Sequence, residues 1–325
     1  MRLKVRLLSN LDSRLTQDRA TMNKDMSKNV AAEEKRSTAF IGLGAMGFPM
    51  AGHLQSAGYP TTVYNRSPAK ASHWHETYKG KTAPTPAEAA FNADLVFVCV
   101  GNDDDVREVT LGNQGVLTTL KPGSILIDHT TASANLAREL QAACQEKNIG
   151  FLDAPVSGGQ AGAESGQLTI MTGGEPSTFN SAQPVMSVYG KSVRLMGPCG
   201  TGQLTKMANQ ICIAGVLQGL SEALHFSDRA GLDTAAVIEA ISQGAAQSWQ
   251  MDNRSQTMIQ GQFDFGFAVD WMRKDLGLVL DAASTAGASL PLTALVDQFY
   301  GDVQNLGGGR WDTSSLIERL RKLNA

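Results

Sequence analysis

A lysine followed by two side-chain amides is the pattern in this chain that could carry out proton transfer. Lys206 lies among apolar residues in Gly200–Gln210, a segment that opens a long helical pattern. Asn209 and Gln210 follow it at the i+3 and i+4 positions of a helix, where an amide can orient an ammonium group or a substrate. Desolvation and the positive end of a helix both lower the pKa of such an amine towards working pH. Lys206 is therefore a candidate acid–base group, and the alternative is a lysine that reaches out to solvent.

The segment Asp153–Gly159 is a candidate site for an anion. It leaves an apolar strand pattern and ends in two glycines. Ser157 offers a hydroxyl, while Gly158 and Gly159 leave their backbone N–H groups free to approach a negative charge. Such a loop at the carboxyl edge of a sheet suits a small carboxylate, and an ordinary turn is the alternative.

A glycine pattern near residue 42 could bind a nucleotide. Gly42, Gly44 and Gly47 form a Gly-x-Gly-x-x-Gly pattern between a short apolar run and a helical pattern. The first glycine permits a tight turn, the second lets the backbone approach a pyrophosphate, and the third lets helix and strand pack closely. The N-terminus of the following helix attracts phosphate charge. We therefore predict a dinucleotide cofactor here, against the alternative of a structural turn. The predicted contact residues are Gly42, Leu43, Gly44, Ala45, Met46 and Gly47.

The next apolar run, Thr61–Tyr64, ends in Asn65-Arg66-Ser67, about where the ribose of a dinucleotide is recognised. An acidic residue there would accept hydrogen bonds from a ribose 2′-hydroxyl and favour NAD, whereas an arginine accommodates a 2′-phosphate. These residues include an arginine and no acid, so they predict NADP(H) as the preferred cofactor, with NAD(H) as the alternative. The structural alternative is a solvated arginine at the end of a strand.

The bulk composition is that of a globular protein long enough for two domains. The chain has 325 residues, of which 42% are hydrophobic and 18% charged, and its net charge is −3. The negative charge argues against nucleic-acid binding, and no apolar run is long enough to span a bilayer. We therefore expect a cytoplasmic protein whose partner is a small-molecule carboxylate.

The cysteines and histidines show no metal-ligand spacing, so no metal site is predicted. Cys99 lies in an apolar strand pattern and Cys212 in an apolar helical pattern, and both are predicted to be small core residues. We expect a reduced intracellular protein without a structural disulfide.

Residues 1–36 differ from the rest of the chain because they are rich in charge and show no strong strand or core-helix pattern. Their basic, leucine-bearing beginning resembles a weak targeting helix. Asp12, Asp18 and Asp25 and the lack of a long apolar core argue against a secretory signal. We predict a disordered tail or an over-long start, with the initiator at Met22 or Met26.

Apolar runs alternate with helical patterns as far as about residue 198. Strands are predicted at Thr38–Ile41, Thr61–Tyr64, Asp94–Val100, Ser124–Asp128, Gly150–Asp153, Leu168–Met171 and Ser192–Leu195. Ser133 is placed to cap a helix with apolar residues at Leu136 and Leu140. The alternation predicts an α/β domain at 37–198, with a mostly parallel sheet that binds ligands at its carboxyl edge.

From about residue 199 the pattern is helical. Gln203–Ala230 is predicted to be one long helix, and further helices are predicted at Thr234–Gln243, Ser248–Gln260 and Val269–Ala286. The long helix is apolar on more than one face, so it needs more than one packing partner. We therefore predict an all-helical domain at 199–325 and a homo-oligomer.

Four segments together resemble the signatures of the β-hydroxyacid dehydrogenase family. They are Gly42–Gly47 with Met50-Ala51, Asp153–Gly159, Gly202–Gln210 and Lys274-Asp275-Leu276, in order and at family-like spacing over about residues 38–320. The family includes 3-hydroxyisobutyrate dehydrogenase, tartronate semialdehyde reductase and the glyoxylate/succinic semialdehyde reductases. The resemblance implies an N-terminal Rossmann domain with a doubly wound sheet, an all-helical C-terminal domain, a cleft between them, and a dimer or tetramer.

The resemblance also implies roles for individual residues. Lys206 would be the general acid–base, protonating the alkoxide as hydride reaches the carbonyl carbon and deprotonating the alcohol in the reverse direction. Ser157, Gly158 and Gly159 would hold the substrate carboxylate. Other residues are assigned to substrate (Asn209 and Gln210), to cofactor (Asn65, Arg66, Ser67, Cys99, Val100, Phe267 and Lys274), or to both (Thr131).

Two departures from the family pattern bear on this site. Val100-Gly101 stands where many members have Leu-Pro, so contacts with the nicotinamide half are expected from the backbone there. Asn209-Gln210 stands where several members have two asparagines, which resembles the tartronate semialdehyde reductase branch and leaves open which amide contacts substrate. Lys206 separates the chain from the related imine reductases, which usually replace this lysine.

We therefore expect an NAD(P)-dependent oxidoreductase that reduces a short semialdehyde or keto carboxylate to the hydroxy acid, preferably with NADP(H). Tartronate semialdehyde is the first expected substrate, followed by glyoxylate and succinic semialdehyde. The alternative enzyme is 3-hydroxyisobutyrate dehydrogenase working oxidatively with NAD. A non-catalytic dinucleotide-binding protein is the alternative from another class, because a fold alone proves no activity.

Overall fold

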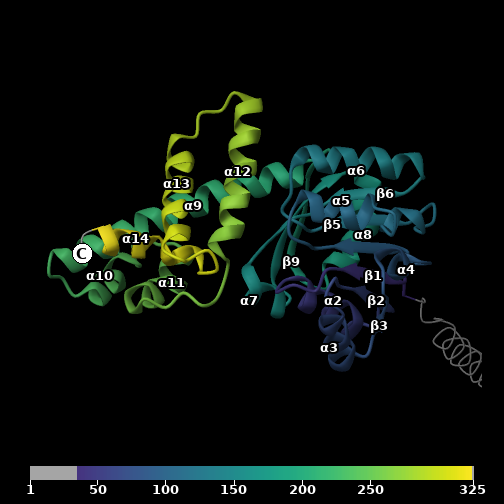
Figure 1. Cartoon of the computed structure of the whole chain (residues 1–325), viewed down its shortest axis with the longest axis horizontal. Coiled ribbons are helices and arrows are strands. Elements are labelled where there is room, and N and C mark those ends of the chain that lie inside the picture. The colour runs from purple at the N-terminus through teal and green to yellow at the C-terminus, as the bar shows by residue number, and fades with distance from the viewer. Residues whose placement is uncertain (1–34, 324–325) are drawn as a thin grey trace, which may run out of the picture. The chain divides into compact units, whose positions relative to one another are not determined.

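Short apolar runs bounded by turn residues form one sheet in the computed structural model, which describes residues 35–323. The strands are β1 (Thr38–Ile41), β2 (Thr61–Tyr64), β3 (Lys81–Thr82), β4 (Leu95–Val98), β5 (Ile125–Asp128), β6 (Gly150–Asp153), β7 (Val156–Ser157), β8 (Leu168–Gly174) and β9 (Gly190–Gly197). They lie in the order β3-β2-β1-β4-β5-β6-β8-β7, with β9 paired to β8 (Figure 1). Every predicted strand is present, and β1, β2 and β6 have the predicted bounds.

Most of the sheet is parallel. The strands from β3 across to β6 run in one direction, so their carboxyl ends meet at one edge. β8 runs antiparallel to β6 and pairs with β9 in parallel. The strand order reverses between β1 and β4, which is the place where doubly wound sheets bind ligands.

Side chains alternate between two hydrophobic cores, one on each face of the sheet. Phe40 and Phe97 stack at 5.9 Å between ring centroids in the first core, while Ile41 and Val98 belong to the second. Figure 1 shows the helices that cover these faces. The first core receives side chains from α2 (Gly47–Ser56), α3 (Pro68–Tyr78), α7 (Gly159–Glu164) and α8 (Pro176–Met186), and the second from α4 (Pro86–Ala90), α5 (Asp103–Leu111) and α6 (Ala134–Glu146).

Beyond Gly197 the described chain is helical, apart from an isolated bridge between Ala268 and Asp312. The α-helices are α9 (Thr201–Arg229), α10 (Thr234–Ile241), α11 (Trp249–Gln260), α12 (Val269–Ala286), α13 (Pro291–Asn305) and α14 (Leu316–Leu323). α9 packs against α11, α12, α13 and α14, and it also contacts β6, β8 and β9. One long helix therefore joins the sheet to the helical part of the chain.

Polar residues fix the ends of several helices. Ser133 caps α6 as predicted, because its hydroxyl accepts a 3.0 Å hydrogen bond from Leu136 N. Ser248 caps α11 in the same way through Met251 N at 3.1 Å. Gly287 ends α12 in the left-handed conformation, with φ of 68°.

Two predictions differ from the structure. Cys212 is exposed, so the prediction that it is a small core residue is wrong, whereas Cys99 is half-buried and packs against the first core. Cys212 lies with Leu204 and Val216 on an exposed face of α9, because the helix is apolar on more faces than one chain covers. α13, at Pro291–Asn305, was not predicted.

The predicted tail at 1–36 falls outside the described residues except for Lys35 and Arg36. Within residues 35–323, no helix combines the length and apolar character needed to cross a membrane. The same part of the chain holds no group of His, Cys, Asp and Glu side chains suited to a metal ion.

Candidate active site

The glycine turn lies at the carboxyl end of β1, beside the end of β4. Gly42 has φ of +100°, and a Cβ on it would lie 2.2 Å from the carbonyl oxygen of Cys99. A Cβ on Gly47 would lie 2.0 Å from the carbonyl oxygen of Gly42. Both positions therefore require glycine, one for the turn and its contact with β4 and the other for the packing of α2 against β1.

The middle of this turn is open and fits a dinucleotide. No atom lies within 4 Å of a Cβ built on Gly44, and both Gly44 and Ala45 are exposed. The first turn of α2 carries no acidic residue that would repel a phosphate. An exposed backbone at a helix N-terminus is a binding site for phosphate groups.

Asn65 supports the turn directly. Its Oδ1 accepts a 2.9 Å hydrogen bond from Leu43 N, and its Nδ2 donates to the carbonyl of Ser67 at 3.1 Å. The side chain of Arg66 is 88% exposed and lies 3.2 Å from Asp105 Oδ1 on α5. Asn65 therefore holds the loop in shape, while the guanidinium of Arg66 pairs with Asp105 and remains accessible to a ligand from solvent.

The ends of β4 and β5 bring the predicted nicotinamide residues together. Cys99 N donates to Ile41 O at 2.9 Å, and Val100 N donates to the hydroxyl of Thr130 at 3.1 Å. Burial raises the pKa of the Cys99 thiol to about 12, so it stays protonated. Thr131 follows directly in the loop after β5 and is half-buried.

Lys206 is buried, with 7% of its surface exposed. Within residues 35–323 its ammonium group forms no hydrogen bond or ion pair. Desolvation lowers the pKa of Lys206 to about 8, while the nearby charge of Asp275 raises it and that of Lys274 lowers it further. A lysine with a pKa near working pH can both donate and accept a proton.

Asn209 and Gln210 point to different partners. Ser157 Oγ lies 3.5 Å from Asn209 Oδ1, and Asn209 Nδ2 donates to Gln210 Oε1 at 2.7 Å. Gln210 is buried, and its Nε2 donates to Asp275 Oδ2 at 2.7 Å. Asn209 therefore faces the glycine-rich loop, whereas Gln210 is used within the protein.

Asp275 continues this network to Lys274. It is buried, and its Oδ1 lies 2.9 Å from Lys274 Nζ in an ion pair without hydrogen-bond alignment. Lys274 Nζ also donates to the carbonyl oxygen of Thr131. A continuous set of contacts thus runs from the loop at Ser157 to the loop at Thr131.

The glycine-rich loop presents backbone rather than bulky side chains. Gly158 and Gly159 have φ of +137° and +61°, a conformation that favours glycine, and both are exposed. Phe267 stands apart from the other predicted residues: it is 37% exposed, and its N–H donates to Asp312 Oδ2 at 2.9 Å. No hydrogen bond or ring contact joins it to them within the described chain.

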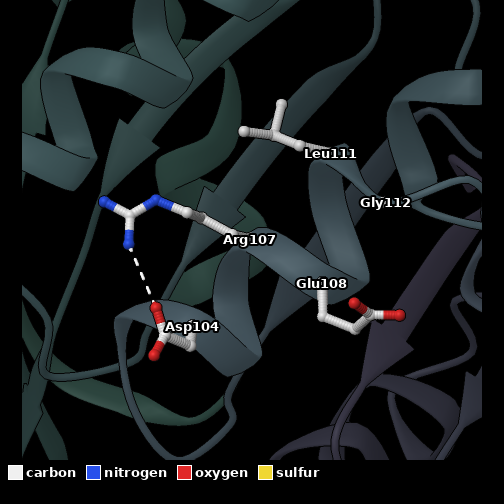
Figure 2. Close-up of a pocket in the computed structure, with 5 residues that line it drawn as sticks. All are labelled: Asp104, Arg107, Glu108, Leu111 and Gly112. Atoms are coloured by element: carbon white, nitrogen blue, oxygen red, sulfur yellow. Dashed lines mark hydrogen bonds and ion pairs between the residues drawn. The ribbon is translucent and has the colours of Figure 1, made fainter.

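A surface pocket on α5 lies elsewhere. Figure 2 shows its lining, Asp104, Arg107, Glu108, Leu111 and Gly112, none of which is a predicted site residue. Another pocket, lined in part by Asn102 and Asp103, reaches Lys274 and borders the site.

Comparison with known families assigns both halves of the chain. Residues 37–197 match the profile described as the NAD-binding domain of 6-phosphogluconate dehydrogenase. Residues 200–320 match the one described as NAD-binding of NADP-dependent 3-hydroxyisobutyrate dehydrogenase. The chain belongs to the β-hydroxyacid dehydrogenase family. Its members are NAD(P)-dependent enzymes that act on CH–OH groups, so the cofactor of this chain is a nicotinamide dinucleotide.

Individual members of the family align over most of the chain. An uncharacterised oxidoreductase of Shewanella frigidimarina is 63% identical over 284 residues, covering 87% of this chain and 98% of that protein. A probable mitochondrial 3-hydroxyisobutyrate dehydrogenase-like protein of Arabidopsis thaliana is 39% identical, covering 94% and 91%. The solved structure of 3-hydroxyisobutyrate dehydrogenase from Mycobacterium tuberculosis with L-serine is 29% identical, with a TM-score of 0.80 and coverage of 88% and 99%.

Two buried acids of the site were not predicted as site residues. Asp275 belongs to a segment that resembles a family signature, but its role depends on a hydrogen bond with Gln210 that joins two helices far apart in the sequence. Asp153 accepts hydrogen bonds from Gly200 N at 2.7 Å and Gln203 N at 2.9 Å, so it holds the beginning of α9. Its position at the end of a predicted strand was the available signal, because such positions face the ligand edge of the sheet.

Proposed function

We propose that this enzyme reduces a short carbonyl carboxylate to the hydroxy acid, with Lys206 as the general acid. The observation that carries the proposal is a buried lysine whose pKa is lowered to about 8, on a helix that contacts the anion loop. A structural lysine would be expected to pair its ammonium group. Lys206 instead keeps its ammonium group for a ligand.

In the proposed reaction the bound nicotinamide supplies a hydride to the carbonyl carbon. Lys206 donates a proton to the carbonyl oxygen as negative charge builds there, and it takes the proton back in the oxidative direction. Ser157 and the N–H groups of Gly158 and Gly159 hold the carboxylate, which fixes the distance between the carbonyl and Lys206.

Asn209 is the proposed substrate contact of the two amides. Its Oδ1 lies within 3.5 Å of Ser157 Oγ in the anion loop, and its side chain is half-buried. Gln210 donates a hydrogen bond from Nε2 to Asp275 and accepts one at Oε1 from Asn209. Both polar atoms of its side chain are therefore used within the protein, and Gln210 would affect the substrate only through Asn209.

NADP(H) is the proposed cofactor form. Arg66 is exposed beside the turn that would bind the pyrophosphate. The side-chain Oδ1 of Asn65 accepts a hydrogen bond from Leu43 N and carries no negative charge that could favour a ribose 2′-hydroxyl. The cofactor site would be held by Gly42–Gly47, Asn65, Arg66, Ser67, Cys99, Val100, Thr131, Phe267 and Lys274.

Tartronate semialdehyde is the proposed first substrate, because the Asn209-Gln210 pair resembles that branch of the family. The second candidate is 3-hydroxyisobutyrate oxidation with NAD, which the names of the Arabidopsis and Mycobacterium relatives favour. Both substrates are short carboxylates with one carbon to be reduced or oxidised, so the site chemistry is shared.

The deciding experiment is a panel of initial rates with NADPH and NADH on tartronate, succinic and methylmalonate semialdehydes and glyoxylate, with 3-hydroxyisobutyrate oxidation measured in parallel. A clear preference for tartronate semialdehyde with NADPH supports the first proposal. Faster turnover of 3-hydroxyisobutyrate with NAD replaces it with the second. No turnover, together with tight NADPH binding, would favour a binding protein.

We also propose a homo-oligomer that uses the exposed face of α9. Apolar or small residues recur along this face at helical spacing: Leu204, Ala208, Cys212, Val216, Gly219 and Phe226 are all exposed. Exposed apolar stripes of this length are typical of interaction surfaces. Light scattering of the purified protein tests the proposal, and a monomer at micromolar concentration would reject it.

The proposed domain division is 37–198 for cofactor binding and 199–325 for substrate binding and oligomerisation. The two family profiles meet between 197 and 200, and the last strand ends at Gly197. Limited proteolysis tests this division, because a true boundary gives two protected fragments.

A further inference from the structure

One buried amide joins the first turn of α9 to the loop after β5. Gln203 is 1% exposed. Its Oε1 accepts a 3.0 Å hydrogen bond from Ala132 N, and its Nε2 donates to Thr130 O at 2.7 Å. Both ends of the amide are thus used on the backbone on either side of Thr131.

The backbone of Gln203 is fixed independently of its side chain. Gln203 N donates to Asp153 Oδ2 at 2.9 Å, and Gly200 N donates to Asp153 Oδ1 at 2.7 Å. A Cβ on Gly202 would lie 2.6 Å from the carbonyl oxygen of Asp153, so the helix is seated closely on β6. The side-chain amide of Gln203 therefore extends from a backbone segment that Asp153 holds in place.

Lys206 follows Gln203 by three residues, which is nearly one turn of the same helix. The loop that contains Thr131 is also held from α12, because Lys274 Nζ donates a hydrogen bond to the carbonyl oxygen of Thr131. The loop at 130–132 is therefore clamped between α9 and α12. Lys206 and the 130–132 loop are therefore both held by the first turns of α9.

We propose that Gln203 is a positioning residue that sets the place of Thr131 relative to Lys206. It does so through the paired hydrogen bonds of its amide with the loop backbone. This inference rests on the proposed function, in which Thr131 helps to hold the cofactor and Lys206 donates the proton to the carbonyl oxygen. A displacement of about 1 Å between such groups can cost about a hundredfold in rate.

A glutamate at this position gives a test that a purely structural role would not pass. A glutamate carboxylate can accept from Ala132 N but cannot donate to Thr130 O. A protonated glutamic acid can do both, as the native amide does. Because burial raises the pKa of a carboxyl group, Gln203→Glu becomes a better mimic of the native residue as pH falls.

The experiment compares kcat, KM for each substrate and thermal stability in Gln203→Glu, Gln203→Met and the parent, between about pH 5 and about pH 8. We expect Gln203→Met to lose about tenfold to a hundredfold in kcat with a smaller change in KM for the cofactor. The rate of Gln203→Glu relative to the parent should rise as pH falls. Gln203→Met should show no such pH-dependent recovery.

Gln218 provides matched controls on the same helix. It is also buried, but its Nε2 donates to Glu222 Oε1 at 2.7 Å and it makes no hydrogen bond to the 130–132 loop. Gln218→Met and Gln218→Glu should lower thermal stability while leaving kcat at the parent value. Equal kcat losses in the Gln218 and Gln203 variants would overturn the proposal.

Hydrogen exchange supplies a readout that does not depend on turnover. The amide of Ala132 should exchange faster in Gln203→Met than in Gln218→Met, because it loses its acceptor. Unchanged exchange at 130–132, or a stable Gln203→Met with parental kcat, would overturn the inference. An inactive parent would reject the proposed function instead, and the exchange data would still decide whether Gln203 orders the loop.

Discussion

Asp275 on α12 accepts a 2.7 Å hydrogen bond from Gln210 Nε2 on α9, and both side chains are buried. The same carboxylate forms an ion pair with Lys274, which in turn donates to the loop at Thr131. A single negative charge therefore lies near both Lys206 and Lys274. Removing this charge should change the pKa of Lys206 without exposing the hydrophobic core.

Asp275→Asn should shift the pH profile of carbonyl reduction to lower pH. Reduction needs protonated Lys206, so the parent rate should fall as pH rises through about 8. The charge of Asp275 raises the pKa of Lys206, so its loss lowers that pKa and moves the fall to lower pH. Initial rates across pH measure the shift. Asp281→Asn, an exposed change on the same helix, should keep the parent profile, and superimposable profiles for Asp275→Asn would contradict the assignment.

Lys206→Ala should lower kcat by about 10²–10⁴-fold, the usual contribution of a general acid. NADPH binding should be retained, because Lys206 forms no hydrogen bond or ion pair with the residues of the glycine turn. Steady-state kinetics and fluorescence titration with NADPH measure the two effects separately. Lys191→Ala on the exposed side of β9 is the control, and a Lys206→Ala variant with parental turnover would remove the lysine from the mechanism.

Substitutions at Arg66 and Asp105 should move cofactor preference in opposite directions. Arg66→Asp removes the cation proposed to meet a 2′-phosphate, so the preference for NADPH over NADH should fall by about tenfold or more. Asp105→Asn releases Arg66 from its 3.2 Å ion pair and removes a nearby negative charge, so that preference should rise. The ratio of kcat/KM for the two cofactors measures both effects. Asp104→Asn, on the same helix, should leave it unchanged, and no response at Arg66 would assign phosphate recognition elsewhere.

Two adjacent buried groups should oppose each other in the pH dependence of stability. Burial lowers the pKa of His129 from 6.5 to about 4, so the unfolded state binds more protons there and stability falls as pH drops from about 6.5 to about 4. Burial raises the pKa of Asp128 from 3.8 to about 7, so its contribution is present at low pH and is lost as pH rises towards 7. In the parent these slopes largely cancel.

Asp128→Asn should therefore leave the titration of His129 to determine how the free energy of unfolding changes with pH. Its amide oxygen can still accept the 2.9 Å hydrogen bond from Thr130 N. The free energy of unfolding should rise with pH between about 4 and 6.5 by up to about 1.4 kcal/mol per pH unit more steeply than in the parent. Urea unfolding at several pH values measures it. Asp104→Asn, an exposed change, should follow the parent, and parallel curves for all three proteins would mean that folding does not raise the pKa of Asp128.

Val216→Glu should shift the proposed oligomer towards monomer. It places a charge in the centre of the exposed apolar face of α9, where a contact with another copy would desolvate it. Leu111 on α5 is 39% exposed, as is Val216, so Leu111→Glu is a matched control outside this face. Light scattering at several concentrations measures the change. The same mass for both variants and the parent would place the subunit contact on another surface.

The strands were predictable because local patterns decide them. Phe40 and Ile41 lie in a run that contributes apolar side chains to both faces of the sheet. Gly42 follows the run and indicates a turn. The cap at Ser133 was predictable for the same reason, since its partner is three residues away. The position of the glycine-rich loop at the carboxyl edge of the sheet follows from the end of β6 at Asp153.

The network around Asp275 could not be predicted in the same way. Gln210 and Asp275 are 65 residues apart in sequence, and their contact depends on how two helices pack. The family resemblance predicted that Lys274 faces the cofactor. No local sequence pattern predicted that the side chain of the next residue, Asp275, packs against α9. The prediction for Cys212 was wrong because an apolar helical pattern does not say which of its faces the rest of the chain covers.

α9 is 29 residues long and is not interrupted by proline or by a described break. At about 1.5 Å per residue it is a rod of about 40 Å, clamped at one end by Asp153. A tilt of a few degrees at this clamp would move Phe226, at the far end, by several ångströms while barely shifting Lys206. A change in the packing around Phe226 would therefore reposition the far end of α9 while leaving the geometry around Lys206 the same.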